Sequence, residues 1–171
     1  DSGSNPATHF LGTTDAQPLV LRTRNVQSLR LEPSAELFGG NPITANVIAG
    51  SSQNFVTPGV RGATIAGGGV PLGDSDPATI GEGPNRVADS YGSIGGGYAN
   101  VVGNDSGTTT DRAFATIAGG IANFATGRHS AVGGGSSNIA NGEGATVAGG
   151  ATNDATAANS TVSGGVANSA S

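Results

Sequence analysis

One apolar position recurs along the C-terminal third of the chain with a constant step. Within residues 115–171 a β-branched residue returns every 15 positions between small residues, and an asparagine follows it six positions later with the same step. Such a fixed period determines the architecture before any local propensity is considered. The four copies place the β-branched residue at Ile117, Val132, Val147 and Val162.

The repeat predicts an all-β fold. A unit of 15 residues is too short for a helix pair, and its main residues, Gly, Ser, Thr, Val and Asn, are poor helix formers. We therefore expect a parallel β-solenoid (β-roll) of about 15-residue coils, with two short strands per coil and Gly or Asn at corners that need positive φ. Stacked coils lie about 4.8 Å apart, so equivalent residues form columns.

The same unit can be traced back to residue 45, which gives a solenoid over 45–171. Two segments, 70–84 and 103–113, interrupt the period and are predicted to be loops inserted at corners; Ile80, 15 positions after Ile65, leaves open one extra coil in the first of them. Seven or eight coils would form a rod about 35 to 40 Å long. The core column is Ile48, Ile65, Ile94, Ile117, Val132, Val147 and Val162, and the asparagine column at the corner is Asn54, Asn100, Asn123, Asn138, Asn153 and Asn168.

Residues 1–44 precede the repeat and are predicted to form an N-terminal arm and a β-hairpin cap. Residues 1–17 are polar and rich in turn formers. Leucines then alternate with other residues on both sides of Asn25, which indicates a hairpin with leucine on one face. Because an isolated pair of strands is marginally stable, we expect the leucine face to cover the open end of the solenoid.

The last copy of the repeat stops in mid-unit at Ser171. A solenoid end without a cap exposes strand edges, which pair readily with another chain. Two expectations follow: the natural chain continues, or this end docks on another molecule, such as the hairpin end of the next copy.

Composition favours a thin interior. Aromatic residues make up 4% of the chain, and it has 31 glycines, no tryptophan and no methionine. Such a chain cannot fill a wide core, which implies burial shared with neighbouring chains. The net charge of −5 and seven scattered arginines without lysine argue against a nucleic-acid partner. No apolar run approaches the roughly 20 residues of a membrane span.

No residue pattern indicates an enzyme, so no catalytic, cofactor-binding or metal-ligating residue is predicted. The two histidines, His9 and His129, lack an acid at catalytic spacing, and cysteine is absent. The inserted loops carry oxygen ligands of the kind calcium prefers, but in no known calcium-loop pattern, so solvated acids are the expectation. Those loop residues are Asp74, Asp76, Asn104, Asp105 and Asp111.

The neighbours of each core-column residue are small or hydroxylated. They point away from the core in a strand, so they predict a flat outer face. That face suits packing against another chain; contact with a carbohydrate or an ice lattice, or simple exposure, are the alternatives. Together with the hairpin leucines it gives the candidate self-association residues Leu19, Leu21, Leu29, Leu31, Thr116, Thr146 and Thr161.

The series Gly120, Asn123, Ala125, Gly127, Ser130, Val132 and Gly134, repeated over 135–149, resembles the head repeats of trimeric autotransporter adhesins of the YadA type and segments of trimeric tail fibres. The resemblance covers about residues 46–171. It implies a left-handed parallel β-roll, a tight trimer, and binding to matrix proteins or other surfaces. The chain departs from the family pattern by a period one residue longer, Asn in place of Ser at the corner, and Ala157 in place of a glycine.

These observations predict a non-enzymatic structural segment or subunit of an extracellular or cell-surface fibre. Its expected partners are copies of itself, three by the resemblance, and a host matrix, glycan or cell surface reached through the loops 70–84 and 103–113. One alternative is a filament subunit that polymerises head to tail through uncapped solenoid ends. Another is an ice- or glycan-binding solenoid.

Overall fold

The computed structural model describes residues 10–34, 37–74 and 83–171, and every regular element in them is a β-strand. The N-terminal strands are β1 (Leu19–Thr23), β2 (Val26–Pro33), β3 (Leu37–Phe38), β4 (Asn41–Pro42) and β5 (Ala45–Ala49). Two-residue strands follow: β6 (Phe55–Val56), β7 (Thr64–Ile65), β8 (Arg86–Val87), β9 (Ser93–Ile94), β10 (Val101–Val102), β11 (Thr116–Ile117), β12 (Phe124–Ala125), β13 (Ala131–Val132), β14 (Ile139–Ala140), β15 (Thr146–Val147), β16 (Asp154–Ala155), β17 (Thr161–Val162) and β18 (Ser169–Ala170).

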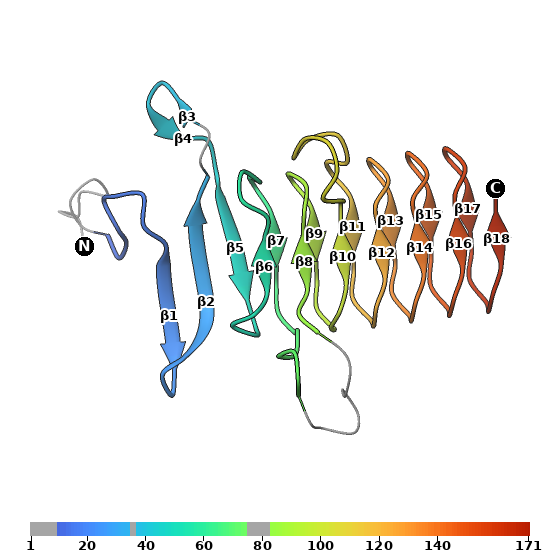
Figure 1. Ribbon diagram of the computed structural model, residues 1–171, viewed down its shortest axis with the longest axis horizontal. Coiled ribbons are helices and arrows are strands. Elements are labelled where there is room, and N and C mark those ends of the chain that lie inside the picture. The colour runs from blue at the N-terminus through green and yellow to red at the C-terminus, as the bar shows by residue number, and fades with distance from the viewer. Residues whose placement is uncertain (1–9, 35–36, 75–82) are drawn as a thin grey trace, which may run out of the picture.

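From β5 onwards the strands alternate between two parallel sheets. One sheet has nine strands in the order β1-β2-β5-β7-β9-β11-β13-β15-β17, and the other has seven in the order β6-β8-β10-β12-β14-β16-β18. Each turn of the chain adds one strand to each sheet, so the turns stack along the long axis from the hairpin to the C-terminus (Figure 1). The prediction of an all-β, repetitive stack of parallel strands is confirmed.

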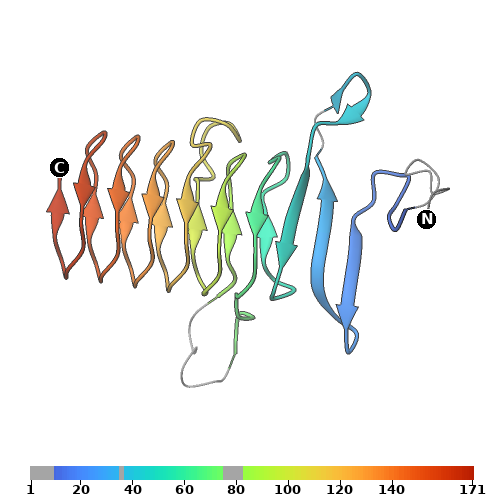
Figure 2. The ribbon, with the colours of Figure 1, turned by 180° about the vertical axis from the view of Figure 1, so that it is seen from behind.

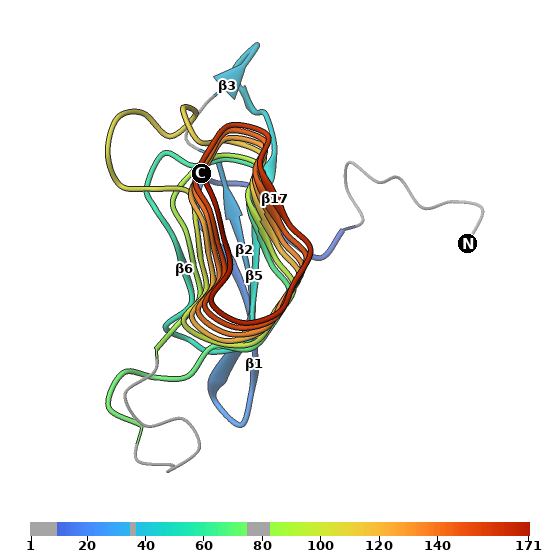
Figure 3. The same cartoon turned by 90° about the vertical axis from the view of Figure 1, so that its right-hand side faces the viewer.

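The register places equivalent residues of successive turns side by side. Thr116 pairs with Ala131, Ala131 with Thr146, and Thr146 with Thr161, so each partner lies 15 residues further along the chain. Seen down the axis, the last turns superpose closely, with the two sheets as opposite walls (Figure 3). Residues at equivalent positions of successive turns therefore lie above one another, because the hydrogen-bonded register of the strands requires it.

The core lies between the two walls and is narrow. The nine-stranded sheet contributes the core column, whose seven side chains are between 0% and 7% exposed. The seven-stranded sheet contributes valine in the early turns and alanine in the later ones, so the interior narrows towards the C-terminus. These inward residues are Val56, Val87, Val102, Ala125, Ala140, Ala155 and the partly buried Ala170.

Both interruptions of the period lie outside the stacked strands. β7 pairs directly with β9, and β8 pairs with both β6 and β10, so the ladders continue from one side of the first insert to the other. The alternative of one extra coil depends on Ile80, which lies outside the described residues. Residues 70–74, the described start of the first insert, and the loop 103–113 leave the stack on opposite edges (Figures 1 and 2).

The hairpin extends the nine-stranded sheet, with β1 antiparallel to β2 and β2 antiparallel to β5. Leu31 pairs with Val47, whereas Arg30 pairs with the core residue Ile48. Since neighbouring residues in a strand point to opposite faces, the leucines lie on the outer face and Arg30 faces the end of the core. The expectation that leucines cover the open end is wrong; Leu21 is 43% exposed.

At the N-terminal end of the stack, the guanidinium of Arg30 makes a hydrogen bond that the backbone of a preceding coil makes elsewhere. Its Nη2 donates to the carbonyl of Asn54 at 3.3 Å, Nη1 donates to Gln27 Oε1 at 3.1 Å, and Nε lies 2.6 Å from Glu32 Oε1. In the next turns the equivalent carbonyl accepts a backbone N–H, as Asn100 O does from Arg86 N at 2.9 Å. The N-terminal end is thus closed by a polar group that satisfies a backbone acceptor.

Candidate interaction surfaces

The asparagine column lies in the interior, not on a surface. Asn123 Oδ1 accepts hydrogen bonds from the backbone N (3.0 Å) and Nδ2 (3.2 Å) of Asn138 in the next coil. Asn123 Nδ2 donates to Asn100 Oδ1 (3.2 Å), Gly119 O (3.1 Å) and Gly135 O (3.0 Å). Asn123 therefore joins three successive coils, and the column holds the stack together.

The structure adds Asn85 to this column, which the sequence prediction omitted. Asn85 N donates to Asn54 Oδ1 at 2.8 Å, and Asn100 Nδ2 donates to Asn85 Oδ1 at 3.1 Å. The loop before Asn85 hides its link to Asn54, 31 residues earlier, although its distance of 15 residues to Asn100 was available as a signal.

The expectation that asparagine supplies positive φ at the corner is also wrong for this column. Positive φ falls instead on the residue before each asparagine of the regular coils, and on nearby glycines such as Gly120, where a Cβ would overlap the carbonyl of Gly135. The asparagine is needed at the corner for its amide. The residues in question are Ala99, Ala122, Ser137, Thr152 and Ala167, with φ between 52° and 56°.

The candidate self-association residues all lie on the outer face of the nine-stranded sheet. Leu31 is paired with Val47 and Val47 with Thr64, from where pairing continues to Thr116 and Thr161. We call this surface the nine-stranded face. It begins with leucine at the hairpin and continues with small or hydroxylated residues, so the structure brings together two groups that the sequence had suggested separately. The remaining members are Leu19, Leu21, Leu29 and Thr146.

The outer face of the seven-stranded sheet differs, and no candidate had been placed on it. Val101, Phe124 and Ile139 are successive neighbours in its ladder and form an apolar stripe. Phe124 is 38% exposed, and the other two are half-buried. The signal lay in the residue after each asparagine, which varies between large apolar and charged types. We call this surface the seven-stranded face; in order along the stack it presents Phe55, Arg86, Val101, Phe124, Ile139, Asp154 and Ser169.

Opposite charges flank the apolar stripe. Arg86, on its N-terminal side, forms an ion pair with Asp105 and lies over the ring of Phe55, 5.9 Å from its centroid. The guanidinium of Arg86 also holds the pKa of Asp105 below its ordinary value. Asp154, on the C-terminal side, has one carboxylate oxygen, Oδ1, that is shielded from solvent and has no hydrogen-bond donor within the described part of the chain.

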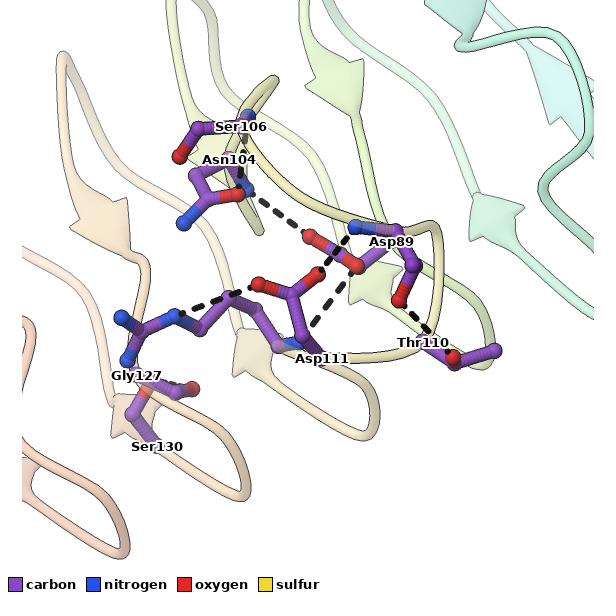
Figure 4. Close-up of polar contacts among 9 residues, drawn as sticks. Asp89, Asn104, Ser106, Thr110, Asp111, Gly127 and Ser130 are labelled. Carbon is purple, nitrogen blue, oxygen red and sulfur yellow. Dashed lines mark hydrogen bonds and ion pairs between the residues drawn. The ribbon is translucent and has the colours of Figure 1, made fainter.

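Asp89 anchors the loop 103–113 to the stack. Its buried carboxylate accepts the backbone N–H of Asn104 through Oδ2 at 2.9 Å and that of Arg112 through Oδ1 at 3.4 Å (Figure 4). Burial raises the pKa of Asp89, and these two hydrogen bonds oppose the shift. The loop is thus fixed near both ends by one side chain, and Arg86 adds an ion pair with Asp105 close to the first of these ends.

The remaining candidate residues, the histidines and the acidic side chains, do not gather into a site in the described part of the chain. Over residues 10–34, 37–74 and 83–171, no three His, Cys, Asp or Glu side chains gather as a metal site would require. His129 stacks on Phe114 with centroids 5.4 Å apart, and Phe114 stacks on Tyr91 at 5.1 Å. His9 and Asp76 lie outside the described residues. The histidine that can be placed therefore takes part in an aromatic stack.

A search of the described residues for a helix long and apolar enough to cross a membrane finds none. Comparison with the models of known protein families, with characterised proteins and with solved structures finds no match to this chain.

Proposed function

We propose that this chain is a non-enzymatic structural protein, a β-solenoid segment of an extracellular fibre that associates with copies of itself. In this interpretation each coil has about 15 residues, and the stack supplies a stiff, self-supporting rod. Stiffness follows from the two inner columns, because every coil is bonded to its neighbours by backbone and side-chain amides at once.

The observation that carries the proposal is the apolar stripe on the outer face of the seven-stranded sheet. A thin stack cannot bury large side chains inside, and it carries Val101, Phe124 and Ile139 in a row outside. Contiguous apolar residues on a flat sheet face are typical of surfaces that pack against another chain. The flat nine-stranded face offers a second surface of suitable shape.

Adhesion is proposed for the two inserted loops, 70–84 and 103–113. They leave the stack where insertion does not disturb the ladders, and in repeat proteins such inserts carry the binding functions. The anchoring of 103–113 by Asp89 supports this proposal, because a loop held in one conformation loses less entropy on binding.

Mass measurement in solution tests the proposal. Sedimentation velocity and light scattering on the intact chain, from about 10 μM to 1 mM, should show association that increases with concentration. The resemblance to trimeric adhesin heads predicts three copies, whereas open-ended polymers visible by electron microscopy would indicate head-to-tail filaments. A monomer over the whole range would contradict self-association and direct attention to an ice- or glycan-binding role for the threonine-bearing face.

A further inference from the structure

The five central side chains of the seven-stranded face, between the end residues Phe55 and Ser169, are arranged symmetrically about Phe124. Phe124 is central, with Val101 one rung before it and Ile139 one rung after it; Arg86 and Asp154 come next on either side. Reversing the direction of the stack therefore exchanges apolar with apolar and positive with negative.

We propose that this face binds a second copy of the chain in antiparallel orientation, about a two-fold axis that passes through Phe124. The inference rests on the proposed self-association and specifies its surface and geometry, with two copies in place of the three that the resemblance predicts. In this pair Phe124 meets Phe124 of the other copy, Val101 meets Ile139, and Arg86 meets Asp154. An isologous contact of this kind is self-complementary and closes after two copies.

Electrostatics separates this arrangement from packing of the same face in parallel register. In parallel register Asp154 would lie beside Asp154 of the other copy, and Arg86 beside Arg86, so both contacts would be repulsive. In the antiparallel pair both contacts are attractive and each occurs twice. Association through complementary charges favours the second arrangement.

Asp154 supplies a second observation. One of its carboxylate oxygens is already withdrawn from solvent and has no donor among the described residues. A shielded acceptor without a donor is costly, and a guanidinium from a second copy would supply the missing donor. Arg86 can serve here because its ion pair with Asp105 uses Nη1, and a guanidinium carries five N–H donors.

The size of the contact sets the expected strength. From Arg86 to Asp154 the stripe covers four rung steps, about 19 Å, and facing sheets pack about 10 Å apart. This contact lies at the small end of specific interfaces, so the pair should dissociate on dilution and form towards the upper part of the concentration range.

A matched pair of substitutions within one coil tests the surface. Ile139→Arg places a charge in the stripe, and Ala131→Arg places the same charge on the opposite, nine-stranded face. We expect Ile139→Arg to abolish association and Ala131→Arg to leave it unchanged, with circular dichroism and the melting temperature checking that both variants fold. The reverse result would overturn this inference while leaving the proposed function intact; a wild-type monomer at all concentrations would contradict both.

Cross-linking tests the geometry without disturbing charge. The chain has no cysteine, so Val101→Cys and Ile139→Cys each introduce the only thiol. With a thiol-reactive linker of about 10 Å reach, matching the spacing of packed sheets, the mixed variants should cross-link while each alone gives little product. Strong cross-linking of Val101→Cys with itself would indicate parallel register and overturn the proposal, as would no product from the mixture at 1 mM.

The substitution Asp154→Asn tests the orientation independently, because it should change the dimer affinity in opposite directions in the antiparallel and parallel arrangements. It should weaken an antiparallel pair roughly 2- to 30-fold, because two ion pairs are lost. In parallel register the same change would remove a repulsion and strengthen association. A stronger dimer in Asp154→Asn would therefore also exclude the antiparallel arrangement.

Discussion

The two inner columns of the stack show how one period can have two physical origins. The core column and the asparagine column recur with the same step and are both buried through the middle of the stack. The first is held by burial of apolar surface, which is not directional and tolerates changes of shape. The second is held by hydrogen bonds that require donor and acceptor at defined positions. The amide column should therefore be far less tolerant of substitution, although its residues are small and polar.

The largest effect should come from Asn123→Asp. The carboxylate keeps the two bonds from Asn138 but faces three acceptors that it can no longer satisfy. A buried, unpaired charge costs about 3–5 kcal/mol of unfolding free energy at neutral pH. Burial raises the folded-state pKa of such a group, so its stability is retained below the unfolded pKa of about 3.9 and lost as pH rises. Urea unfolding at pH 4 and pH 7 measures the difference.

The control for this prediction is Asn168→Asp in the exposed last rung, which solvent can compensate. Equal losses at the two positions would show that burial in the column is not the cause.

Asn123→Leu should cost nearly as much, about 3–4 kcal/mol, with no pH dependence. Leucine has the same branched arrangement of heavy atoms but leaves the backbone N–H of Asn138 and the carbonyl of Gly119 without partners inside the stack, whereas the carbonyl of Gly135 keeps its bond from the backbone N–H of Ile121. Each buried unsatisfied group costs about 1–3 kcal/mol. Denaturant unfolding at pH 7 provides the measurement, and a loss below about 1 kcal/mol would remove the distinction between the two columns.

Ile117→Ala in the core column should cost somewhat less, about 2–4 kcal/mol, through lost burial and the cavity left behind. Ile117 is completely buried, and its neighbour Thr116 points outwards in the same strand. Thr116→Ala is the matched control and should stay within about 0.5 kcal/mol of the wild type. Equal losses in the two variants would mean that the strand does not separate an inner from an outer face.

The smallest expected effect is the dependence of the unfolding free energy on pH through Asp89 and Asp105. Neither inner column contains an ionisable side chain. A change of pH should therefore affect the stability of the stack only through groups outside these columns. Because the pKa of Asp89 is raised, its stabilising contribution is complete below 3.8 and is lost as pH rises through its folded value. The pKa of Asp105 is lowered, so its contribution is lost in acid. Over the range from about pH 2 to neutrality, the wild type should therefore lose stability relative to Asp89→Asn as pH rises above about 4, and should lose stability relative to Asp105→Asn as pH falls below about 4.

Thermal unfolding across that range, with hydrogen exchange of the Asn104 and Arg112 amides, measures both effects. Identical pH profiles for the two variants would show that the loop 103–113 is not coupled to the stack.

Much of the fold was predictable because a stack repeats its inner positions. Ile117, Val132 and Val147 occupy the same environment in successive coils, so the same residue type returns at a constant step. Asn85 escaped the prediction because an insert separates it from Asn54, and distance along the chain no longer reports distance along the stack. The hairpin leucines were assigned to the wrong side because alternation shows that two faces exist without showing which one continues the core.

The outer faces were less accessible to sequence reasoning. Their residues meet solvent or another chain, so nothing in the coil forces Val101, Phe124 and Ile139 to resemble one another, and no repeat marks them as a group. Only the register of β8, β10, β12, β14 and β16 lines up that stripe between Arg86 and Asp154. The anchoring of the loop 103–113 by Asp89 was likewise hidden, because it joins residues in different coils.

The sequence by itself determined that the chain is a stack of short parallel strands with one aliphatic column inside and one amide column at the corner. Periodic burial demands periodic residues, and that demand is visible in a single chain. Tertiary structure alone decided which side of the hairpin faces outwards, how Arg30 closes the first coil, and which outer residues become neighbours. These follow from strand pairing between distant segments, which places no periodic constraint on the amino-acid sequence.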